Sequence, residues 1–369
     1  MTIGVIANED KDKGFAIARR LADSIHMRGG SAILATQGIT SFNGCDVLIC
    51  IGGDGTLIKV IRETLFFGTP ILGVNLGSLG YLTEVEASQI DVMLDRIFNH
   101  DYRVEERMML TITRESGRQL GGRGIAYEDS YENSNDSAYD ESIDGAYDES
   151  NVGTYKNSNV SSYEGYEPDP SDIKHNLEET AINELAIGRG DEPHVIRLKL
   201  YINDTFLDVF PGDGILISTP TGSTAYSLSA GGPVIDPELN AISIVPVCPH
   251  VIFSRPVLVA PDKEISIVPV DAATTRSGGI LPQSHPTNTS FDKNASTAPG
   301  TFRASVSVDG FRGPDLRPGE IIRVRRSKHV TKMLRFNADN FYDVLKNKLF
   351  ESSYKFEPGK IIRGAPVNG

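Results

Sequence analysis

Apolar strands alternate with amphipathic helices along the first hundred residues, and this alternation limits the possible folds more than any other feature. Short apolar runs predict buried strands at residues 3–7, 31–35, 46–51 and 71–74. Apolar side chains at helical spacing predict helices at residues 14–27, 56–67 and 87–98. Strands that alternate with helices form a parallel sheet covered on both faces. We therefore expect an α/β domain with a Rossmann-like parallel sheet over residues 1–107.

Short strands separated by turn residues replace this pattern from residue 108 onward. They are predicted at residues 109–113, 182–187, 195–201, 206–209, 215–218, 242–247, 257–260, 265–269, 304–308 and 321–324. Asn203-Asp204 is typical of a hairpin turn between two of them. The pattern predicts an all-β sandwich domain over residues 108–332. In the C-terminal segment, 333–369, a strand and a helix are expected to pack back on the first domain.

Two inserts interrupt the β-rich part, at residues 116–172 and 271–300. In the first insert a tyrosine recurs every eight residues from Tyr131 to Tyr163, among many Asp, Ser and Asn residues. Such a composition buries too little apolar surface to offset its ordering entropy, which predicts a surface loop without fixed structure. The alternative is a tyrosine array that binds a partner or is phosphorylated. The second insert is rich in Ser, Thr, Pro and Asn and is also predicted to be a loop.

The distribution of charge argues against nucleic-acid binding. Most of the formal net charge of −13 lies in the first insert, and the rest of the chain is close to neutral, without a general basic patch. Cys45, Cys50 and Cys248 have neither zinc-site spacing nor the even number of a disulfide framework, which fits a reducing compartment. We see no signal peptide and no run of the ~20 apolar residues that a membrane span needs. We expect a cytoplasmic protein that binds neither nucleic acid nor membrane.

The sequence Gly52-Gly53-Asp54-Gly55-Thr56 joins a predicted strand to a helix and is the first candidate for chemistry. Glycines let backbone amides approach phosphate oxygens, and a helix N-terminus favours negative charge. A carboxylate there repels phosphate unless it holds a metal ion or takes a proton from a nucleophile, as a kinase requires. The alternative is a tight turn in which Asp54 caps the helix. Because neither a Walker P-loop nor a G-x-G-x-x-G fingerprint stands where it should, this turn must hold the phosphates.

Two further polar segments lie in the β-rich part. Asn183-Glu184 interrupts an apolar strand segment, 181–187, and can match the polar edges of adenine and ribose, although polar pairs at strand edges are common. After Gly212-Asp213-Gly214 come T-P-T-G-S-T-A-Y-S-L-S, residues 219–229, and then G-G-P, residues 231–233. The small and hydroxyl side chains allow a ligand to come close, and Tyr226 can stack on a base. A Ser/Thr-rich turn that caps the next helix is the alternative.

The ordered set of G-G-D-G-T, N-E, G-D-G, T-P-T-G-S-T-A-Y-S and G-G-P resembles the NAD kinase family over most of residues 1–114 and 173–350. Diacylglycerol kinases, sphingosine kinases and phosphofructokinases share G-G-D-G, so the T-G-S-T-A-Y-S run is the specific element. The resemblance implies phosphoryl transfer from ATP, or polyphosphate, to the 2′-hydroxyl of the adenosine ribose of NAD. It also implies Mg²⁺ with the ATP, no dedicated metal site in the protein, and a homo-oligomer, either dimer or tetramer.

The resemblance assigns roles to the matched positions. Asp54 would accept the proton of the 2′-hydroxyl, and Gly55 would contact the dinucleotide. Lys59 would reach a phosphate, and Tyr81 would lie near the substrate. The substrate would be held by Asn183 and Glu184 at the adenosine and by Asp213 at the nicotinamide end. The adenine pocket, at a subunit contact, would be lined by Thr224, Ala225, Tyr226, Ser227, Leu228 and Ser229.

Some positions depart from the family pattern. Pro211 stands where several relatives carry arginine or another polar residue, and Asp309-Gly310-Phe311 replaces a glutamine that some relatives have after D-G. We expect His250, which matches a family stretch, to be a packed histidine. Two other functions stay open: a lipid kinase of the diacylglycerol type, and a catalytically silent NAD sensor whose tyrosine repeat recruits partners. The choice between NAD and NADH also stays open.

Overall fold

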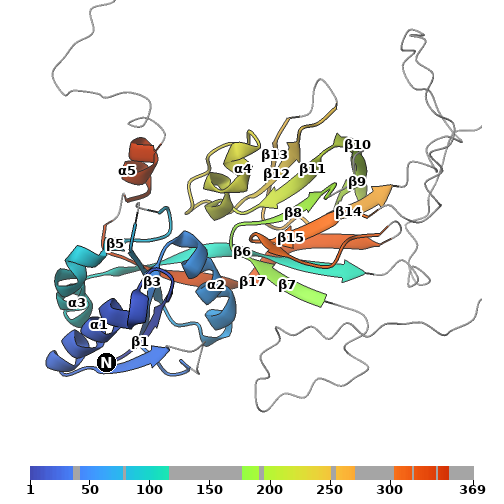
Figure 1. The fold of residues 1–369 in the computed structure, drawn as a ribbon. Coiled ribbons are helices and arrows are strands. Elements are labelled where there is room, and N and C mark those ends of the chain that lie inside the picture. The colour runs from blue at the N-terminus through green and yellow to red at the C-terminus, as the bar shows by residue number, and fades with distance from the viewer. Residues whose placement is uncertain are drawn as a thin grey trace, which may run out of the picture.

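The computed structural model describes residues 1–35, 42–77, 80–115, 177–190, 195–250, 255–270, 303–317, 320–337 and 340–348. Both inserts, 116–172 and 271–300, lie outside these ranges, so the expectations for them, including the tyrosine repeat, stay predictions. The described chain forms an α/β part and a β-sandwich part, joined by two long strands (Figure 1). This arrangement confirms the predicted fold class.

Four parallel strands form the sheet of the α/β part, in the order β2-β1-β3-β4. They are β1 (Thr2–Ala7), β2 (Ser31–Ala35), β3 (Val47–Gly52) and β4 (Ile71–Asn75), and the short β5 (Val85–Glu86) pairs with β4. Helices α1 (Ala16–Met27) and α3 (Ile90–Phe98) share one core with the sheet, and α2 (Asp54–Thr64) shares a second core on the other face. Single 3₁₀ turns extend these helices: η1 (Lys13–Phe15), η2 (Leu65–Phe67) and η3 (Ala87–Gln89). Because both faces are covered, β3 and β4 are buried along their whole length.

Two long antiparallel strands, β6 (Arg103–Glu115) and β17 (Ile321–Arg335), run from the α/β part into the sandwich (Figure 1). Near its C-terminal end β17 pairs in parallel with β4, so one eleven-stranded sheet continues through both parts. The buried Glu84 carboxylate fixes this end, because it accepts the backbone N–H of Phe336 at 3.0 Å and pairs with Arg335. The domain boundaries expected at residues 107 and 332 fall inside these strands and stay predictions.

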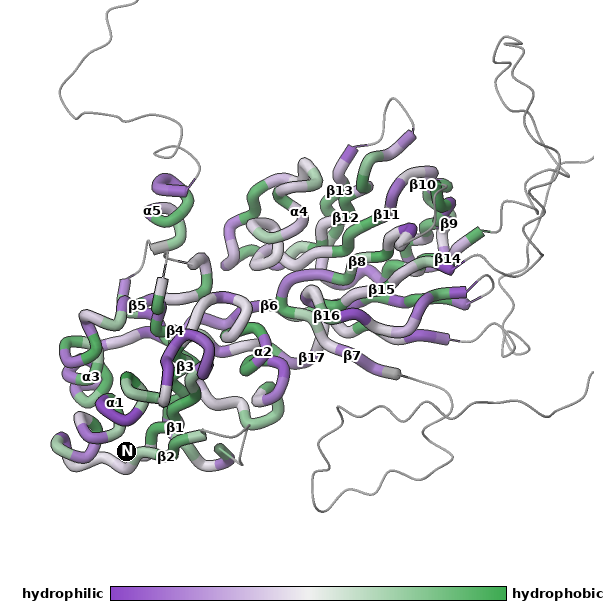
Figure 2. The backbone as a smooth tube through the Cα atoms, in the orientation of Figure 1, coloured by the Kyte–Doolittle hydropathy of each residue, from purple (hydrophilic) through white to green (hydrophobic). Residues whose placement is uncertain are grey.

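The sandwich forms where the rest of this sheet faces a second sheet. The first layer adds β7 (Leu177–Ala181), β9 (Ile196–Ile202), β10 (Thr205–Gly212) and β14 (Ile265–Val270) to β6 and β17. The second layer has the order β13-β12-β11-β8-β15-β16. Its strands are β8 (Glu184–Gly188), β11 (Gly214–Ser218), β12 (Ile242–Val247), β13 (Val257–Val259), β15 (Ser305–Val308) and β16 (Phe311–Arg312). Apolar side chains of both layers form one core. In Figure 2 the strands in the middle of both parts carry the colour of hydrophobic residues.

The strand expected over residues 182–187 is β8, but it begins two residues later than predicted, at Glu184. β7 ends at Ala181 and belongs to the first sheet, whereas β8 begins at Glu184 and belongs to the second. The chain therefore changes sheets at Ile182-Asn183, and the polar pair lies at this crossing. Asn203 and Asp204 both have positive φ, 48° and 63°, between β9 and β10, which confirms the predicted hairpin turn.

Candidate active site

The carboxylate of Asp54 is fixed by three backbone N–H groups rather than by the helix that Asp54 begins. Tyr81 N–H donates to Oδ2 at 2.8 Å, and Leu82 and Thr83 N–H donate to Oδ1 at 3.2 and 3.3 Å. A Cβ at Gly80 would overlap this carboxylate, so a larger residue there would displace it from its present position. The N-cap of α2 is Gly53, without a side-chain hydrogen bond, and the capping role considered for Asp54 is therefore not the one the structure shows.

The glycine turn brings backbone amides and one ammonium group together. Gly53 is extended (φ −131°, ψ −175°), and α2 begins directly after it. A Cβ placed on Gly53 would stand 2.8 Å from Nζ of Lys11, which lies in the loop between β1 and α1. Motif reasoning did not select Lys11. Only the strand order points to Lys11. β1 neighbours β3 in the sheet, and the loops that follow adjacent parallel strands meet at one edge of it.

The Asp309 carboxylate holds the backbone of the Asn183-Glu184 pair. The Asp309 carboxylate accepts the N–H groups of Ile182 at 2.9 Å, Asn183 at 2.7 Å and Glu184 at 3.1 Å. Asp309 and Gly310 both have positive φ in the hairpin between β15 and β16, which directs the carboxylate at the crossing. Sequence reasoning recorded this D-G only as a departure from the family pattern.

Glu184 occupies an environment that favours its neutral form. Its side chain is buried, and Oε2 has no hydrogen-bond partner among the described residues. Burial, and after it the neighbouring Asp309 carboxylate, raise the pKa of Glu184 to about 7. Burial also raises the pKa of Asp309, although the three N–H groups and Arg62 oppose the rise. The site therefore holds a carboxyl group that changes charge near neutral pH.

The hydroxyl-rich run packs directly on this pair. Thr219 N–H donates to the Asn183 carbonyl at 2.9 Å, and the Thr219 hydroxyl bonds to the Ile182 carbonyl. A Cβ at Gly222 would overlap the backbone of Asn183, so the close approach of the two turns requires glycine. The run forms a 3₁₀ turn, η6 (Thr221–Thr224), and a short helix, α4 (Tyr226–Ser229), and neither has a side-chain cap. It is therefore not the helix-capping turn considered as the alternative.

The predicted members of the adenine pocket differ in exposure. Tyr226 is 48% exposed and Ser229 is exposed, Thr224, Ala225 and Leu228 are half-buried, and Ser227 is fully buried. The Ser227 hydroxyl has no hydrogen-bond partner among the described residues. The run thus offers the exposed aromatic ring of Tyr226, on which a base could stack.

Helix α2 connects Asp54 to the crossing that carries Glu184. Arg62, two turns after Asp54, donates from Nη1 to the Val308 carbonyl at 2.7 Å and from Nη2 to the Glu179 carboxylate at 3.3 Å. Its guanidinium also lies 4.8 Å from the centre of the Phe311 ring. These contacts hold the hairpin of Asp309 against the α/β part.

A cavity of about 220 Å³ lies next to the candidate site, and Tyr81 is the predicted site residue in its lining. Tyr81, whose N–H holds Asp54, lines it on one side. Arg107, whose Nη1 lies 3.5 Å from the Thr221 hydroxyl, lines it on the other. It is smaller than the ~300–1,000 Å³ typical of ligand pockets, so a dinucleotide could place only part of itself there.

The C-terminal helix α5 (Asn340–Lys346) closes one side of this cavity. Its Phe341 ring lies 6.4 Å from that of Tyr81, and the Tyr342 hydroxyl bonds to Asp236, which follows G-G-P. Lys348 stacks its ammonium over the Tyr81 ring at 4.4 Å. Burial, and after it Asp54, raise the pKa of the Tyr81 hydroxyl.

One predicted position, Asp213, lies apart from this group. Asp213 directly precedes β11 and forms a salt bridge with Arg189 at 3.0 Å. Glu184 lies beside Ser218, at the other end of β11. Gly55 and Lys59 are exposed on α2. His250 is exposed, so the expectation that it packs in the interior was wrong. Its backbone N–H donates to the carbonyl of Pro211 at 2.8 Å, and this bond holds it at the surface.

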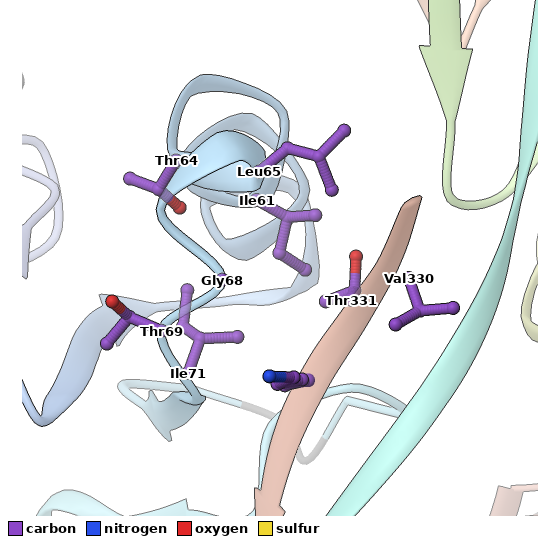
Figure 3. A pocket seen from close by; sticks show the side chains of 9 residues that line it. Ile61, Thr64, Leu65, Gly68, Thr69, Ile71, Val330 and Thr331 are labelled. Atoms are coloured by element: carbon purple, nitrogen blue, oxygen red, sulfur yellow. The ribbon is translucent and has the colours of Figure 1, made fainter. Parts of the chain in front are cut away.

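A second cavity lies at the far end of α2, between that helix and β17 (Figure 3). Its volume is about 20 Å³, room for one water molecule, and its lining includes Ile61, Leu65, Ile71 and Val330. A packing gap of this size and character is no substrate site.

No helix among the described residues combines the length and apolarity that crossing a bilayer requires. Nor do these residues hold a group of three or more His, Cys, Asp or Glu side chains that could bind a metal ion.

Comparison with known proteins gives consistent matches along the chain. Residues 35–102 match the family described as ATP-NAD kinase N-terminal domain, and residues 182–281 match the ATP-NAD kinase C-terminal domain. The NAD kinase of Ruminiclostridium cellulolyticum is 31% identical over 95% of this chain and 98% of its own length. The NAD kinase of Acetivibrio thermocellus is 32% identical over the same shares.

Solved structures agree on the fold. A yeast NADH kinase complexed with NADH superposes with a TM-score of 0.64 at 18% identity, covering 98% of this chain and 90% of the other. An NAD kinase from Archaeoglobus fulgidus in complex with ATP gives a TM-score of 0.59 at 18% identity, covering 94% and 97%.

Proposed function

This chain belongs to the NAD kinase family, and from that premise we propose that it transfers the terminal phosphoryl group of ATP to the 2′-hydroxyl of the adenosine ribose of NAD, giving NADP. One observation carries the proposal. The Asp54 carboxylate is fixed at the N-terminus of α2, partly by the N–H of Tyr81. Tyr81 lines a cavity whose lining also includes Arg107, and Arg107 lies 3.5 Å from the Thr221 hydroxyl in the hydroxyl-rich run.

Asp54 is the proton acceptor in this proposal. Oδ1 accepts two backbone N–H groups and Oδ2 accepts one, and since each carboxylate oxygen has about two acceptor positions, Oδ2 keeps one for the substrate hydroxyl. The proton of the 2′-hydroxyl passes to Oδ2 as the ribose oxygen bonds to the terminal phosphorus of ATP. The bond from that phosphorus to the bridging oxygen breaks, and ADP leaves.

The adenosine of NAD would lie against the crossing between the two sheets. Asn183 offers an amide, and Glu184 offers a buried oxygen that has no partner among the described residues, so both can bond polar edges of ribose or adenine. Thr224, Ala225, Tyr226, Ser227, Leu228 and Ser229 would line the adenine pocket. Gly55 and Tyr81 would contact the substrate near Asp54.

The donor would lie over the glycine turn, with exposed Lys59 in reach of a phosphate. Mg²⁺ would accompany ATP and neutralise phosphate charge. Mg²⁺ commonly binds through substrate phosphates and one or two carboxylates rather than an all-protein cage, so this role needs no dedicated cluster of protein ligands.

A homo-oligomer, dimer or tetramer, is part of the proposal. Both sheets end in strands with exposed apolar side chains, Phe206 and Leu207 on β10 and Leu258 on β13. Asp213, proposed for the nicotinamide end, lies roughly 17 Å along β11 from the Glu184 end.

A cytoplasmic location is proposed as well, supported by three cysteines that are all free.

The test is a direct assay. Purified protein is incubated with ATP and Mg²⁺ plus NAD, NADH or diacylglycerol, and NADP is measured with an NADP-specific dehydrogenase. We expect NADP from NAD. Phosphorylation of diacylglycerol instead would support a lipid kinase, and tight NAD binding without any product would support a silent sensor.

A further inference from the structure

The ammonium group of Lys11 lies against the glycine turn that begins α2. Its Nζ stands 2.8 Å from the place that a Cβ of Gly53 would occupy, so it covers the backbone one residue before Asp54. Lys11 belongs to the loop between β1 and α1, far from the G-G-D-G motif in sequence.

Hydrogen bonds fix the backbone on both sides of Lys11. Asn8 accepts the N–H of Lys11 on its carbonyl at 3.1 Å and the N–H of Asp10 on its side chain at 2.9 Å. The Asn8 amide also donates to the Thr56 hydroxyl in the first turn of α2 at 3.2 Å. On the other side, buried Asp12 accepts the N–H groups of Ile17 and Ala18, each at 2.9 Å. The loop is therefore built to hold its lysine beside α2.

This position is electrostatically unfavourable for a cation on its own. The N-terminus of a helix carries a partial positive charge, which repels an ammonium group. Lys11 is exposed and forms no ion pair among the described residues. The Asp54 carboxylate points to the backbone of Tyr81, Leu82 and Thr83. An anion in contact with both Lys11 and the turn would be attracted by each of them.

We infer that Lys11 binds the phosphates of the nucleoside triphosphate donor over the Gly53–Gly55 turn. The inference rests on the proposed function and deepens it. In that reaction the transferred phosphoryl group must stand in line with a hydroxyl at Asp54, and Gly53 is the neighbouring residue. Lys11 then offsets negative charge on the terminal phosphate as the bond to the leaving oxygen breaks.

The experiment compares Lys11→Ala and Lys11→Arg with the control Lys13→Ala, since Lys13 is an exposed lysine two positions along the same loop. Steady-state constants are measured separately for ATP and NAD, and ATP binding is measured by calorimetry. We expect Lys11→Ala to lower kcat/KM for ATP by about 10- to 100-fold, the range for loss of one charge-assisted phosphate contact. KM for NAD should change less than about twofold, Lys11→Arg should recover most of the loss, and Lys13→Ala should behave as wild type.

Three outcomes would overturn the inference: unchanged kinetics for ATP in Lys11→Ala, an equal loss in Lys13→Ala, or a loss confined to KM for NAD, which would assign Lys11 to the dinucleotide. Failure of the proposed function gives a different result, since wild-type protein would then make no NADP. In that case calorimetry with ATP still decides, because weaker ATP binding in Lys11→Ala alone supports a triphosphate contact.

Discussion

Replacing Glu184 with glutamine should stabilise the protein above neutral pH and have little effect in acid. Burial, and after it Asp309, raise the pKa of Glu184 from 4.5 to about 7 in the folded protein. The folded protein therefore keeps a proton that the unfolded chain loses as pH rises through this window. The stability linked to the neutral form is present below about pH 4.5 and is lost as pH rises to about 7. Glutamine has no charge to lose, so Glu184→Gln escapes this loss.

The magnitude follows from the two pKa values. At about 1.4 kcal/mol per tenfold change, the cost of keeping Glu184 folded is under about 1 kcal/mol at pH 5 and roughly 3 kcal/mol above pH 7. Urea unfolding of wild type and Glu184→Gln should therefore diverge by about 2 kcal/mol between pH 5 and pH 7.5. Exposed Glu178 on β7 provides the matched control, and Glu178→Gln should track wild type at every pH.

A constant difference between Glu184→Gln and wild type from pH 5 to pH 8 would refute the reasoning, because Glu184 would then not be held neutral by its surroundings. The partner supplies a second check. Asp309→Asn removes a negative charge beside Glu184, so the pH at which stability falls should move down toward 4.5.

Three substitutions test the rest of the site. Asp54→Asn should lower kcat by ~10²-fold or more, while calorimetry still detects NAD binding; normal turnover would remove Asp54 from the chemistry. Gly222→Ala places a Cβ on the backbone of Asn183 and should raise KM for NAD at least tenfold in the coupled assay, and an unchanged KM would show that the two turns need not touch. Asp309→Asn leaves one of three N–H bonds unmade and should cost about 1.5–3 kcal/mol in urea unfolding, so an unchanged midpoint would contradict the bracing role.

The sequence predicted the α/β part well because its signals are local. Each strand and helix there carries its own periodicity, and a buried parallel strand such as β3 reads as one apolar run. The positions of G-G-D-G and of the hydroxyl-rich run could be predicted for the same reason. The contacts that hold these segments in place could not be predicted. The three N–H groups on Asp54 come from a loop 27 to 29 residues away, and no pattern marks a backbone donor.

The change of sheet at Ile182-Asn183 shows the limit most clearly. Residues 181–187 read as one apolar strand with a polar pair inside it, and nothing local marks a change of sheet. The cause is Asp309, more than 120 residues away, whose carboxylate satisfies the N–H groups that the crossing leaves without sheet partners. Lys11 escaped motif reasoning for a related reason, since only the adjacency of β1 and β3 brings its loop to the glycine turn.

The connection between the two parts bears on how the site could close. β6 and β17 pair on both sides of the junction, so a free hinge between domains is absent from the described chain. The pairing is interrupted once, where Leu110 pairs with Arg326 and Met108 with Val330, so residues 327–329 face Met109 alone. Such a bulge bends and twists a strand locally. It lies beside residue 107, where the change in sequence pattern predicted a boundary. Movement of one part against the other should therefore bend β17 at residues 327–329, and hydrogen exchange there should slow when NAD binds.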